Sequence, residues 1–326
     1  MSILVTGGLG FIGSHIVAEL LNTNCNVIVI DNCSNSSLEV KNTIMNNFGI
    51  FTFYNNDLLK DDLKYIFENH SIYAVIHCAG LKSVNESIEN PIKYYKENIN
   101  MTLNVLNLMT IHCIKNIIFS SSATIYGSQD APFSENTIIG QGITNPYGKT
   151  KYMIELILQD FDINCICLRY FNPIGCHPSG LIGELPNSTP NNLFPYILQT
   201  AFKKRKQLTI FGNDYNTADG TAERDYIHVC DVARAHISTL SLFKDKNNMY
   251  LCLNVGTGVP VSVQSIIDTF IKTTNIKINY TFGRKRPGDI PVSFCVVSKI
   301  LSNIWKPKYT IEDACKHSKK FYSKMK

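Results

Sequence analysis

Three glycines separated by two residues each, Gly7, Gly10 and Gly13, constrain this chain more than any other feature. They follow at once on an apolar segment at residues 3–6 and precede a helical pattern at residues 14–22. Glycines between a strand and a helix allow a tight turn, a close approach of phosphate oxygens to backbone N–H groups, and close packing of the helix on the strand. The chain therefore begins with a predicted phosphate-binding strand–turn–helix unit.

Apolar segments without polar alternation recur along the first half of the chain, separated by segments with helical patterns. Continuous apolar strands of this kind predict a parallel sheet that is covered by helices on both faces. The expected strands lie at residues 27–30, 51–54, 73–77, 116–120 and 165–169, and the expected helices at 63–68, 91–112 and 146–160. We therefore predict an α/β fold with a doubly wound parallel sheet of the Rossmann type.

The composition changes after the last of these strands, where Pro, Gly and Asn become frequent. We expect a nucleotide-binding Rossmann domain over residues 1–171, to which residues 225–255 return. A smaller mixed α/β lobe that binds the substrate is expected over residues 172–326, mainly 172–224 and 256–326. In such folds a ligand binds in the cleft at the carboxyl ends of the strands.

Charge and hydropathy exclude two classes of partner. The net charge of +5 over 326 residues is modest, and the basic clusters are not interleaved with stacking aromatic residues, which argues against nucleic-acid binding. No segment approaches the ~20 apolar residues that a membrane span needs. The first residues are typical of a strand and not of a secretion signal. We expect neither nucleic acid nor a membrane as a partner.

Cysteine and histidine usage bounds the compartment and the metal content. Eleven cysteines are scattered without a C-x-x-C pair, several of them in apolar segments. This distribution predicts buried free thiols in a reducing compartment, so we expect a cytoplasmic protein. The eight histidines show no ligand spacing, so no metal site is predicted.

An acidic residue, Asp31, ends the second expected strand, 18 residues after Gly13. A carboxylate at this place in a dinucleotide-binding unit accepts hydrogen bonds from the adenosine ribose hydroxyls and repels a 2′-phosphate. The sequence therefore predicts a dinucleotide cofactor and favours NAD over NADP.

A second constellation combines the serine-rich end of a strand, residues 120–122, with the segment that follows Asn145. Asn145 is a good N-cap and Pro146 a good first helical residue, so Tyr147 and Lys151 are predicted to share one helical face. A nearby positive charge favours the phenolate and suits a tyrosine to proton transfer from an alcohol. The Tyr-x-x-x-Lys spacing alone is common, and it gains weight from the serine strand and the glycine motif.

These motifs resemble the extended short-chain dehydrogenase/reductase family, and within it the UDP-glucose 4-epimerase branch. The resemblance covers essentially the whole chain, and its C-terminal motifs are specific to this branch. Its main motifs are Ala79-Gly80-Leu81-Lys82, Ser120-Ser121-Ser122-Ala123-Thr124, Arg169-Tyr170-Phe171-Asn172-Pro173 and Arg224-Asp225-Tyr226-Ile227-His228.

The resemblance implies an isomerase that interconverts UDP-glucose and UDP-galactose through a transient 4-keto sugar, with NAD retained as a catalyst. Tyr147 is then the base for the 4-hydroxyl, Ser122 relays the proton, and Thr124 assists. Lys151 is expected to bind the nicotinamide ribose and to lower the pKa of Tyr147. A homodimer is also implied, with the helices at residues 91–113 and 146–160 paired into a four-helix bundle.

By the same resemblance, two sets of residues line the ligands. The cofactor set comprises Gly7, Gly10, Phe11, Ile12, Gly13, Asp31, Asn32, Asp57, Leu58, Cys78, Ala79, Gly80, Lys82, Asn98, Ser120, Tyr147, Lys151 and Tyr170. The substrate set comprises Lys82, Ser122, Tyr147, Phe171, Asn172, Asn192, Leu193, Thr209, Phe211, Arg224, Tyr226, Arg286, Asp289 and Ser293.

The sequence departs from the branch at two places. Glu97 stands where bacterial relatives often have an Asn near the cofactor, a role that Asn98 or Asn100 can take. Ser293 stands where enzymes restricted to UDP-glucose and UDP-galactose carry a Tyr. Since a small residue there leaves room for a 2-N-acetyl group, we hypothesise that UDP-GlcNAc and UDP-GalNAc are also substrates.

Two alternatives remain. A nucleotide-sugar 4,6-dehydratase or decarboxylase of the same fold usually carries acidic residues after the strand motif, where this chain has Ala123 and Thr124. A catalytically inactive NAD-binding regulator usually loses the Tyr–Lys pair, which is intact here.

Overall fold

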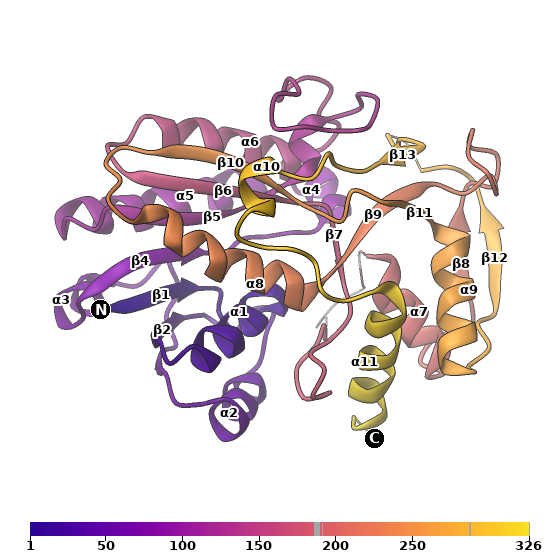
Figure 1. The fold of residues 1–326 in the computed structure, drawn as a ribbon, viewed down its shortest axis with the longest axis horizontal. Coiled ribbons are helices and arrows are strands. Elements are labelled where there is room, and N and C mark those ends of the chain that lie inside the picture. The colour runs from indigo at the N-terminus through magenta and orange to yellow at the C-terminus, as the bar shows by residue number, and fades with distance from the viewer. Residues whose placement is uncertain (186–189, 191, 287, 326) are drawn as a thin grey trace.

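The computed structural model describes residues 1–185, 190, 192–286 and 288–325, and Figure 1 shows their arrangement. A parallel sheet of seven strands forms the middle layer of the larger group of elements. In chain order its strands are β1 (Ser2–Thr6), β2 (Asn26–Ile30), β3 (Thr52–Tyr54), β4 (Ile72–His77), β5 (Asn116–Ser122), β6 (Asn164–Tyr170) and β10 (Tyr250–Val255).

The order across this sheet is β10-β6-β5-β4-β1-β2-β3, and every neighbouring pair is parallel. The chain runs outward from β1 to β3, returns to β4 on the other side of β1, and then runs outward to β10. In such a sheet the crevice between the two oppositely wound halves lies at the carboxyl ends of the strands beside the switch point. The predicted doubly wound α/β fold is confirmed.

Helices cover both faces of the sheet, which explains why its strands lack polar alternation. Ile3 and Val5 of β1 belong to a core that includes residues of α1 (Phe11–Asn22), α2 (Leu38–Asn47) and α8 (Val229–Thr239). Leu4, between them, belongs to the core on the other face. That core includes residues of α5 (Pro91–Ile111) and α6 (Pro146–Gln159) and of the shorter α3 (Lys64–Asn69).

A smaller group of elements, on the right of Figure 1, is built on a mixed sheet in which β9 is central. Strand β9 (Glu223–His228) pairs in parallel with β7 (Asn172–Ile174) and β13 (Val292–Ser293), and antiparallel with β11 (Pro260–Ser262). Residues 225–228 therefore lie in the smaller sheet, whereas α8 and β10 join the layers of the larger one.

A third core fills the space around this mixed sheet. It gathers apolar residues from α7 (Leu193–Ala201), α9 (Val263–Thr274) and α11 (Ile311–Ser323). A separate parallel pair, β8 (Leu208–Phe211) with β12 (Tyr280–Gly283), stands beside α9 in Figure 1. The remaining short elements are α4 (Val84–Glu89), α10 (Lys299–Ser302) and the 3₁₀ turns η1 (Ala123–Tyr126) and η2 (Leu240–Phe243). None of the helices in the described ranges is long and apolar enough to cross a membrane.

Candidate active site

The glycine-rich turn connects β1 to α1 and is packed too closely for side chains. Gly7 has a φ of +67°, and a Cβ there would lie 2.8 Å from the backbone of Ala79. A Cβ at Gly13 would overlap the carbonyl oxygen of Gly7. Gly10 is the N-cap of α1, so the free N–H groups at the start of this helix, at Phe11 and Ile12, border the turn. The predicted position of the glycine motif is confirmed, and the turn has the form of an anion cradle.

Asp31 lies directly after β2 and holds the glycine turn in place. One carboxylate oxygen accepts a hydrogen bond from the N–H of Leu9 at 2.9 Å, and the other accepts from Cys33 N at 2.8 Å and Ser36 Oγ at 2.9 Å. The carboxylate is thus fixed at the edge of the sheet beside Asn32, with lone pairs left for a further donor.

Asp57 and Leu58 follow β3 at the same edge of the sheet. Burial opposes ionisation of Asp57, but the N–H of Leu59 at 2.9 Å and the ammonium of Lys60 at 3.1 Å lower its pKa overall. Leu58 is buried, and its carbonyl accepts from Asn104 of α5 at 2.8 Å. Both residues therefore follow the strand that pairs with β2, the strand that leads to Asp31.

The loop after β4 carries Cys78, Ala79, Gly80 and Lys82 and is fixed by Asn98. The Asn98 side chain accepts from Leu81 N at 2.8 Å and donates to Leu81 O at 3.1 Å. It also donates to Thr150 of α6 at 3.1 Å. These bonds use both N–H groups of the amide and fix the loop, while Oδ1 keeps one lone pair for a further donor. A Cβ at Gly80 would lie 3.8 Å from Lys151 Nζ, which places this loop against the face of α6 that carries Lys151.

The end of β5 and the start of α6 bring together the four predicted catalytic side chains, those of Ser122, Thr124, Tyr147 and Lys151. Asn145 accepts from Gly148 N at 2.8 Å and caps α6, as the sequence predicts. Ser122 Oγ accepts from Thr124 Oγ1 at 3.0 Å, and the Ser122 side chain lies near enough to Tyr147 to lower the pKa of its phenol. Lys151 Nζ lies 5.8 Å from the centre of the Tyr147 ring. A phenol, a hydroxyl and an ammonium thus share one small volume.

Burial sets the electrostatics of this volume. It raises the pKa of Tyr147, and the nearby Ser122 hydroxyl opposes that rise. Burial also lowers the pKa of Lys151 to about 8. The direction for Tyr147 is opposite to the lowering expected from Lys151. The reason is burial of the Tyr147 phenol, while the Lys151 ammonium donates to the carbonyl of Ser120 at 2.8 Å and lies 4.7 Å from the centre of the Phe119 ring. A phenolate there needs further positive charge.

The chain passes from one sheet to the other at Tyr170-Phe171-Asn172. Tyr170 ends β6 opposite Ser122 of β5, and Asn172 begins β7 opposite Tyr226 of β9. Asn172 also donates to the carbonyl of Asp225 at 3.3 Å. Phe171, between them, is buried. Tyr170, a predicted cofactor residue paired with the predicted catalytic Ser122, is therefore adjacent along the backbone to the predicted substrate residues Phe171 and Asn172.

Most of the predicted substrate residues gather on the smaller group of elements. Ser293 of β13 stands opposite Arg224 of β9. Asp289 accepts from Arg286 at 2.7 Å and lies 3.8 Å from Arg224, so one carboxylate holds both guanidinium groups. Arg286 also lies over the ring of Phe211, 5.2 Å from its centre. The pair of arginines keeps a net positive charge, which suits a diphosphate.

Three further substrate candidates lie at the start of α7 and in β8. Asn192 is the N-cap residue of α7 and Leu193 its first residue, while Thr209 lies in β8, two residues before Phe211. The loop that carries Arg286 and Asp289 reaches the segment before α6, because a Cβ at Gly288 would lie 3.2 Å from Thr144. This contact connects the arginine pair to the segment that precedes α6.

Comparison with protein families decides the assignment. Residues 3–256 match the model of the NAD dependent epimerase/dehydratase family. The chain belongs to this family.

Relatives of known name agree with the family. A UDP-glucose 4-epimerase of Dictyostelium discoideum is 46% identical over 330 residues, which cover 98% of this chain and 95% of the relative. A crystal structure of UDP-glucose-4-epimerase from Stenotrophomonas maltophila with bound NAD and formylated UDP-arabinopyranose is 39% identical. Its TM-score is 0.95, and the match covers 100% of this chain and 98% of that one. The UDP-Glc/GlcNAc 4-epimerase of Campylobacter jejuni is 33% identical, with a TM-score of 0.83 over 99% of each chain.

The structure adds three residues that sequence reasoning missed; two of them contact a member of the predicted site, and the third contacts residues next to it in the chain. His236 of α8 lies 2.5 Å from the hydroxyl of Tyr170, which also donates to Ser120 at 2.9 Å. Glu155 binds Ser121 and Arg169. Glu184 binds Lys82. Each of these three residues is well separated in the sequence from the residues that it contacts, and no motif in the sequence points to it.

Two groups of potential metal ligands occur among the described residues, each with donor atoms within 4.8 Å of one another; they are Glu19, His177 and Cys230, and Glu155, Cys167 and Cys252. In the first group His177 Nδ1 accepts from Ser179 N at 3.2 Å, so the neutral ring carries its proton on the other nitrogen. In the second group Glu155 already pairs with Arg169 at 2.7 Å. The expected absence of a metal stays a prediction.

Proposed function

We propose that this chain catalyses the NAD-dependent 4-epimerisation of UDP-hexoses and interconverts UDP-glucose and UDP-galactose. The observation that carries the proposal is the meeting of Ser122, Tyr147 and Lys151 at the carboxyl end of β5. They meet in a chain 46% identical to a UDP-glucose 4-epimerase. The dinucleotide cradle and the paired arginines stand on either side of this meeting point along the chain.

The residues present fit NAD as the resident cofactor. The glycine turn leaves room only for a ligand that approaches the backbone, and the Asp31 carboxylate disfavours a 2′-phosphate. The residues that would hold it are those of the glycine turn, the ends of β2, β3 and β4, and the site at β5 and α6; they are Gly7, Gly10, Phe11, Ile12, Gly13, Asp31, Asn32, Asp57, Leu58, Cys78, Ala79, Gly80, Lys82, Asn98, Ser120, Tyr147, Lys151 and Tyr170. In this division residues 1–171 serve the cofactor, with residues 225–255 in support.

Tyr147 is the proton-transfer group of the proposed reaction. Its phenolic oxygen accepts the proton of the sugar 4-hydroxyl. It returns the proton after the 4-keto sugar has rotated to present its other face. Ser122 Oγ hydrogen-bonds the same sugar oxygen, with Thr124 holding Ser122 in place, and the Lys151 ammonium favours the phenolate. NAD supplies the hydride acceptor and donor at C4, and its oxidised ring adds the positive charge that a buried phenolate needs.

The substrate side is proposed to lie mainly in residues 172–224 and 256–326. Arg224 and Arg286 suit the diphosphate, since a guanidinium binds phosphate oxygens in a bidentate manner. Burial raises the pKa of Tyr226 to about 12, so this phenol stays protonated and can donate. The remaining proposed contacts are Lys82, Phe171, Asn172, Asn192, Leu193, Thr209, Phe211, Asp289 and Ser293.

We also propose that the substrate range includes UDP-GlcNAc and UDP-GalNAc. Ser293 of β13 is paired in register with Arg224 of β9, so it lies next to the residue proposed to bind the diphosphate. Its small side chain leaves space that a Tyr would occupy. A UDP-Glc/GlcNAc 4-epimerase is among the structural neighbours, which supports the idea.

The test is incubation with UDP-glucose, UDP-GlcNAc and UDP-GlcNAcA separately, followed by separation of the epimers. A product of unchanged mass supports an epimerase, whereas loss of water or carbon dioxide would support a dehydratase or decarboxylase. Tyr147→Phe should lower kcat by about 10²–10⁴-fold, because it removes the proton-transfer group. If the wild type neither contains bound NAD nor turns over any of these sugars, the alternative of a catalytically inactive regulator would be favoured.

The N-acetyl range has its own control. Ser293→Tyr should abolish turnover of UDP-GlcNAc and keep turnover of UDP-glucose. Equal effects on both sugars, or no UDP-GlcNAc turnover in the wild type, would refute the assignment to Ser293.

A homodimer is proposed as the assembly. Helices α5 and α6 pack against each other, and Leu103, Met153 and Leu156 on them are 38%, 39% and 42% exposed. Pairing of these helices across a two-fold axis would cover such side chains. Sedimentation of the wild type and of Leu156→Glu distinguishes a dimer through this face from a monomer.

A cytoplasmic location is also proposed. The support is that all eleven cysteines are free thiols, as a reducing compartment allows. Fractionation of the source cells tests it.

A further inference from the structure

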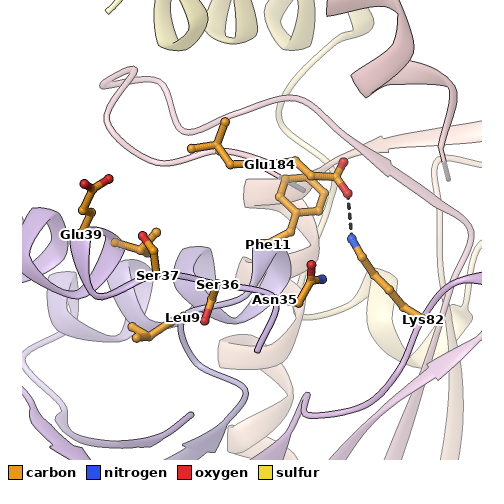
Figure 2. Close-up of a pocket in the computed structure, with 11 residues that line it drawn as sticks. Leu9, Phe11, Asn35, Ser36, Ser37, Glu39, Lys82 and Glu184 are labelled. Atoms are coloured by element: carbon orange, nitrogen blue, oxygen red, sulfur yellow. Dashed lines mark hydrogen bonds and ion pairs between the residues drawn. The ribbon is translucent and has the colours of Figure 1, made fainter. Parts of the chain in front are cut away.

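An ion pair bridges the two sides of the cofactor crevice. Lys82 Nζ lies 2.7 Å from Glu184 Oε1, and the two residues are 102 positions apart in the chain. Lys82 belongs to the loop after β4, whereas Glu184 belongs to the segment that leads from β7 to α7. Figure 2 shows the pair spanning the space next to Phe11 at the start of α1.

Both ends of the bridge are fixed by neighbouring contacts. On the lysine side, Asn98 holds Leu81 by two hydrogen bonds, and Ser83 N donates to the Tyr94 hydroxyl at 3.0 Å. On the glutamate side, Ile182 is buried in the main core. A Cβ at Gly183 would lie 2.7 Å from the Phe321 ring, so this segment is also closely packed. The bridge therefore connects two anchored segments.

The position of the pair relates it to the glycine turn. Lys82 Nζ lies 5.6 Å from the centre of the Phe11 ring, and Phe11 is the first residue of α1. A cavity of about 200 Å³ next to it is lined by residues that include Leu9, Phe11, Ser36, Lys82 and Glu184. The cavity thus joins the glycine turn to the bridge, as Figure 2 shows.

The burial of the two charges is unequal. The Glu184 side chain is 10% exposed and that of Lys82 42% exposed. A nearly buried carboxylate beside a site for a diphosphate repels the ligand unless a cation neutralises it. An ammonium has three donors, so Lys82 can bind Glu184 and a ligand oxygen at the same time. The carboxylate then restricts where the ammonium stands.

We propose that Glu184 is a positioning residue that holds the Lys82 ammonium over the glycine-rich turn, and that the pair slows the release of the dinucleotide. The inference rests on the proposed function, because it assumes that NAD occupies the crevice. It assigns to Glu184 a role in retaining the cofactor, separate from proton transfer at Tyr147.

The experiment measures exchange of bound NAD for isotope-labelled NAD in the purified holoenzyme. Glu184→Ala should release NAD about tenfold faster, because removing one partner of a fixed charge pair acts mainly on dissociation. Glu184→Gln, of the same shape, should show a smaller increase in the same direction. At saturating NAD both variants should keep kcat within about threefold of the wild type. A melting curve of each holoenzyme confirms that it is folded.

Glu39→Ala is the matched control, since Glu39 is a carboxylate that lines the same cavity. It should leave NAD exchange unchanged. The double variant Lys82→Ala/Glu184→Ala should release NAD no more than about twofold faster than Lys82→Ala alone, because Glu184 acts through Lys82.

Two results would overturn the positioning role. One is an unchanged rate of NAD exchange in Glu184→Ala, and the other is a double variant that releases NAD tenfold faster than Lys82→Ala alone. Exchange is measured without sugar turnover, so the two proposals fail separately. A wild type that binds NAD and epimerises nothing refutes the proposed function alone. Normal turnover with Glu184-independent exchange refutes the positioning role alone.

Discussion

Two consecutive turns of α6 bury opposite charges in different ways. Lys151 and Glu155 stand four residues apart, and they are 6% and 0% exposed. Glu155 receives Arg169 through two bonds, Nε to Oε1 at 3.1 Å and Nη2 to Oε2 at 2.7 Å. Among the described residues no carboxylate forms an ion pair with Lys151, whose ammonium donates to the Ser120 carbonyl at 2.8 Å.

The difference separates a structural charge from one that is proposed to be functional. A buried carboxylate with a bidentate guanidinium is satisfied and fixes α6 on β6. A buried ammonium that lacks a carboxylate is unfavourable for the fold, as the lowered pKa of Lys151 shows, and it stays available to a ligand. Proteins tolerate such a cost where function requires it.

The largest expected effect falls on the paired turn. Arg169→Met should lower the free energy of unfolding by about 3–5 kcal/mol, because it leaves Glu155 buried without its partner. Chemical denaturation measures the change. The double variant Arg169→Met/Glu155→Met should recover most of it, since no charge remains buried. Equal instability of the single and double variants would show that the pair itself, and not the orphaned charge, stabilises α6.

The unpaired turn should respond in the opposite sense. Lys151→Met should lower kcat by about 10²–10³-fold, because it removes a charge that stabilises the phenolate. The nucleotide-free variant should nevertheless unfold at the same temperature as the wild type or at a higher one. A melting temperature several degrees lower would mean that Lys151 also supports the fold, and the contrast with Arg169 would then disappear.

The pH dependence of that difference sharpens the contrast. In the folded protein the pKa of Lys151 is lowered from 10.5 to about 8. Between these values the unfolded chain binds a proton that the folded chain does not, so wild-type stability rises with pH. The advantage of Lys151→Met should therefore be largest below pH 8, up to about 3 kcal/mol, and should shrink toward pH 10.5. Unfolding of both nucleotide-free proteins at pH 7 and 9.5 measures it. A difference that does not depend on pH would contradict a buried ammonium.

Sequence reasoning predicted the parts of the fold that local periodicity encodes. The apolar strands, the glycine turn and the capped start of α6 at Asn145 lie where they were expected. Helix α2 was not predicted, because only Ile44 of its ten residues is buried and no apolar face marks it. The lists of cofactor and substrate residues stay predictions. In the structure most cofactor candidates lie at the carboxyl ends of the main strands, and most substrate candidates lie on the smaller group of elements.

Long-range partners were out of reach of the sequence. Glu155 has no motif of its own, and its role depends on Arg169 of β6. Glu184 meets Lys82 only because two loops 102 residues apart reach the same crevice. The expected lowering of the Tyr147 pKa by Lys151 together with bound NAD stays a prediction; in the nucleotide-free protein burial raises this pKa, and spacing on a helix says nothing about burial. Charge and desolvation are set by tertiary packing, and they decide which buried groups are structural.

The smallest expected effect concerns the start of α6, which supports the functional turn. Asn145 caps the helix through Gly148 N at 2.8 Å, two residues before Tyr147. Asn145→Ala should lower the free energy of unfolding by about 1 kcal/mol, and Asn145→Ser, which keeps an acceptor, should lower it less. The Glu155–Arg169 pair fixes the next turns, so fraying should stay near Tyr147 and reduce kcat more than NAD affinity. A loss of stability as large as that of Arg169→Met would show that the two turns form one cooperative unit.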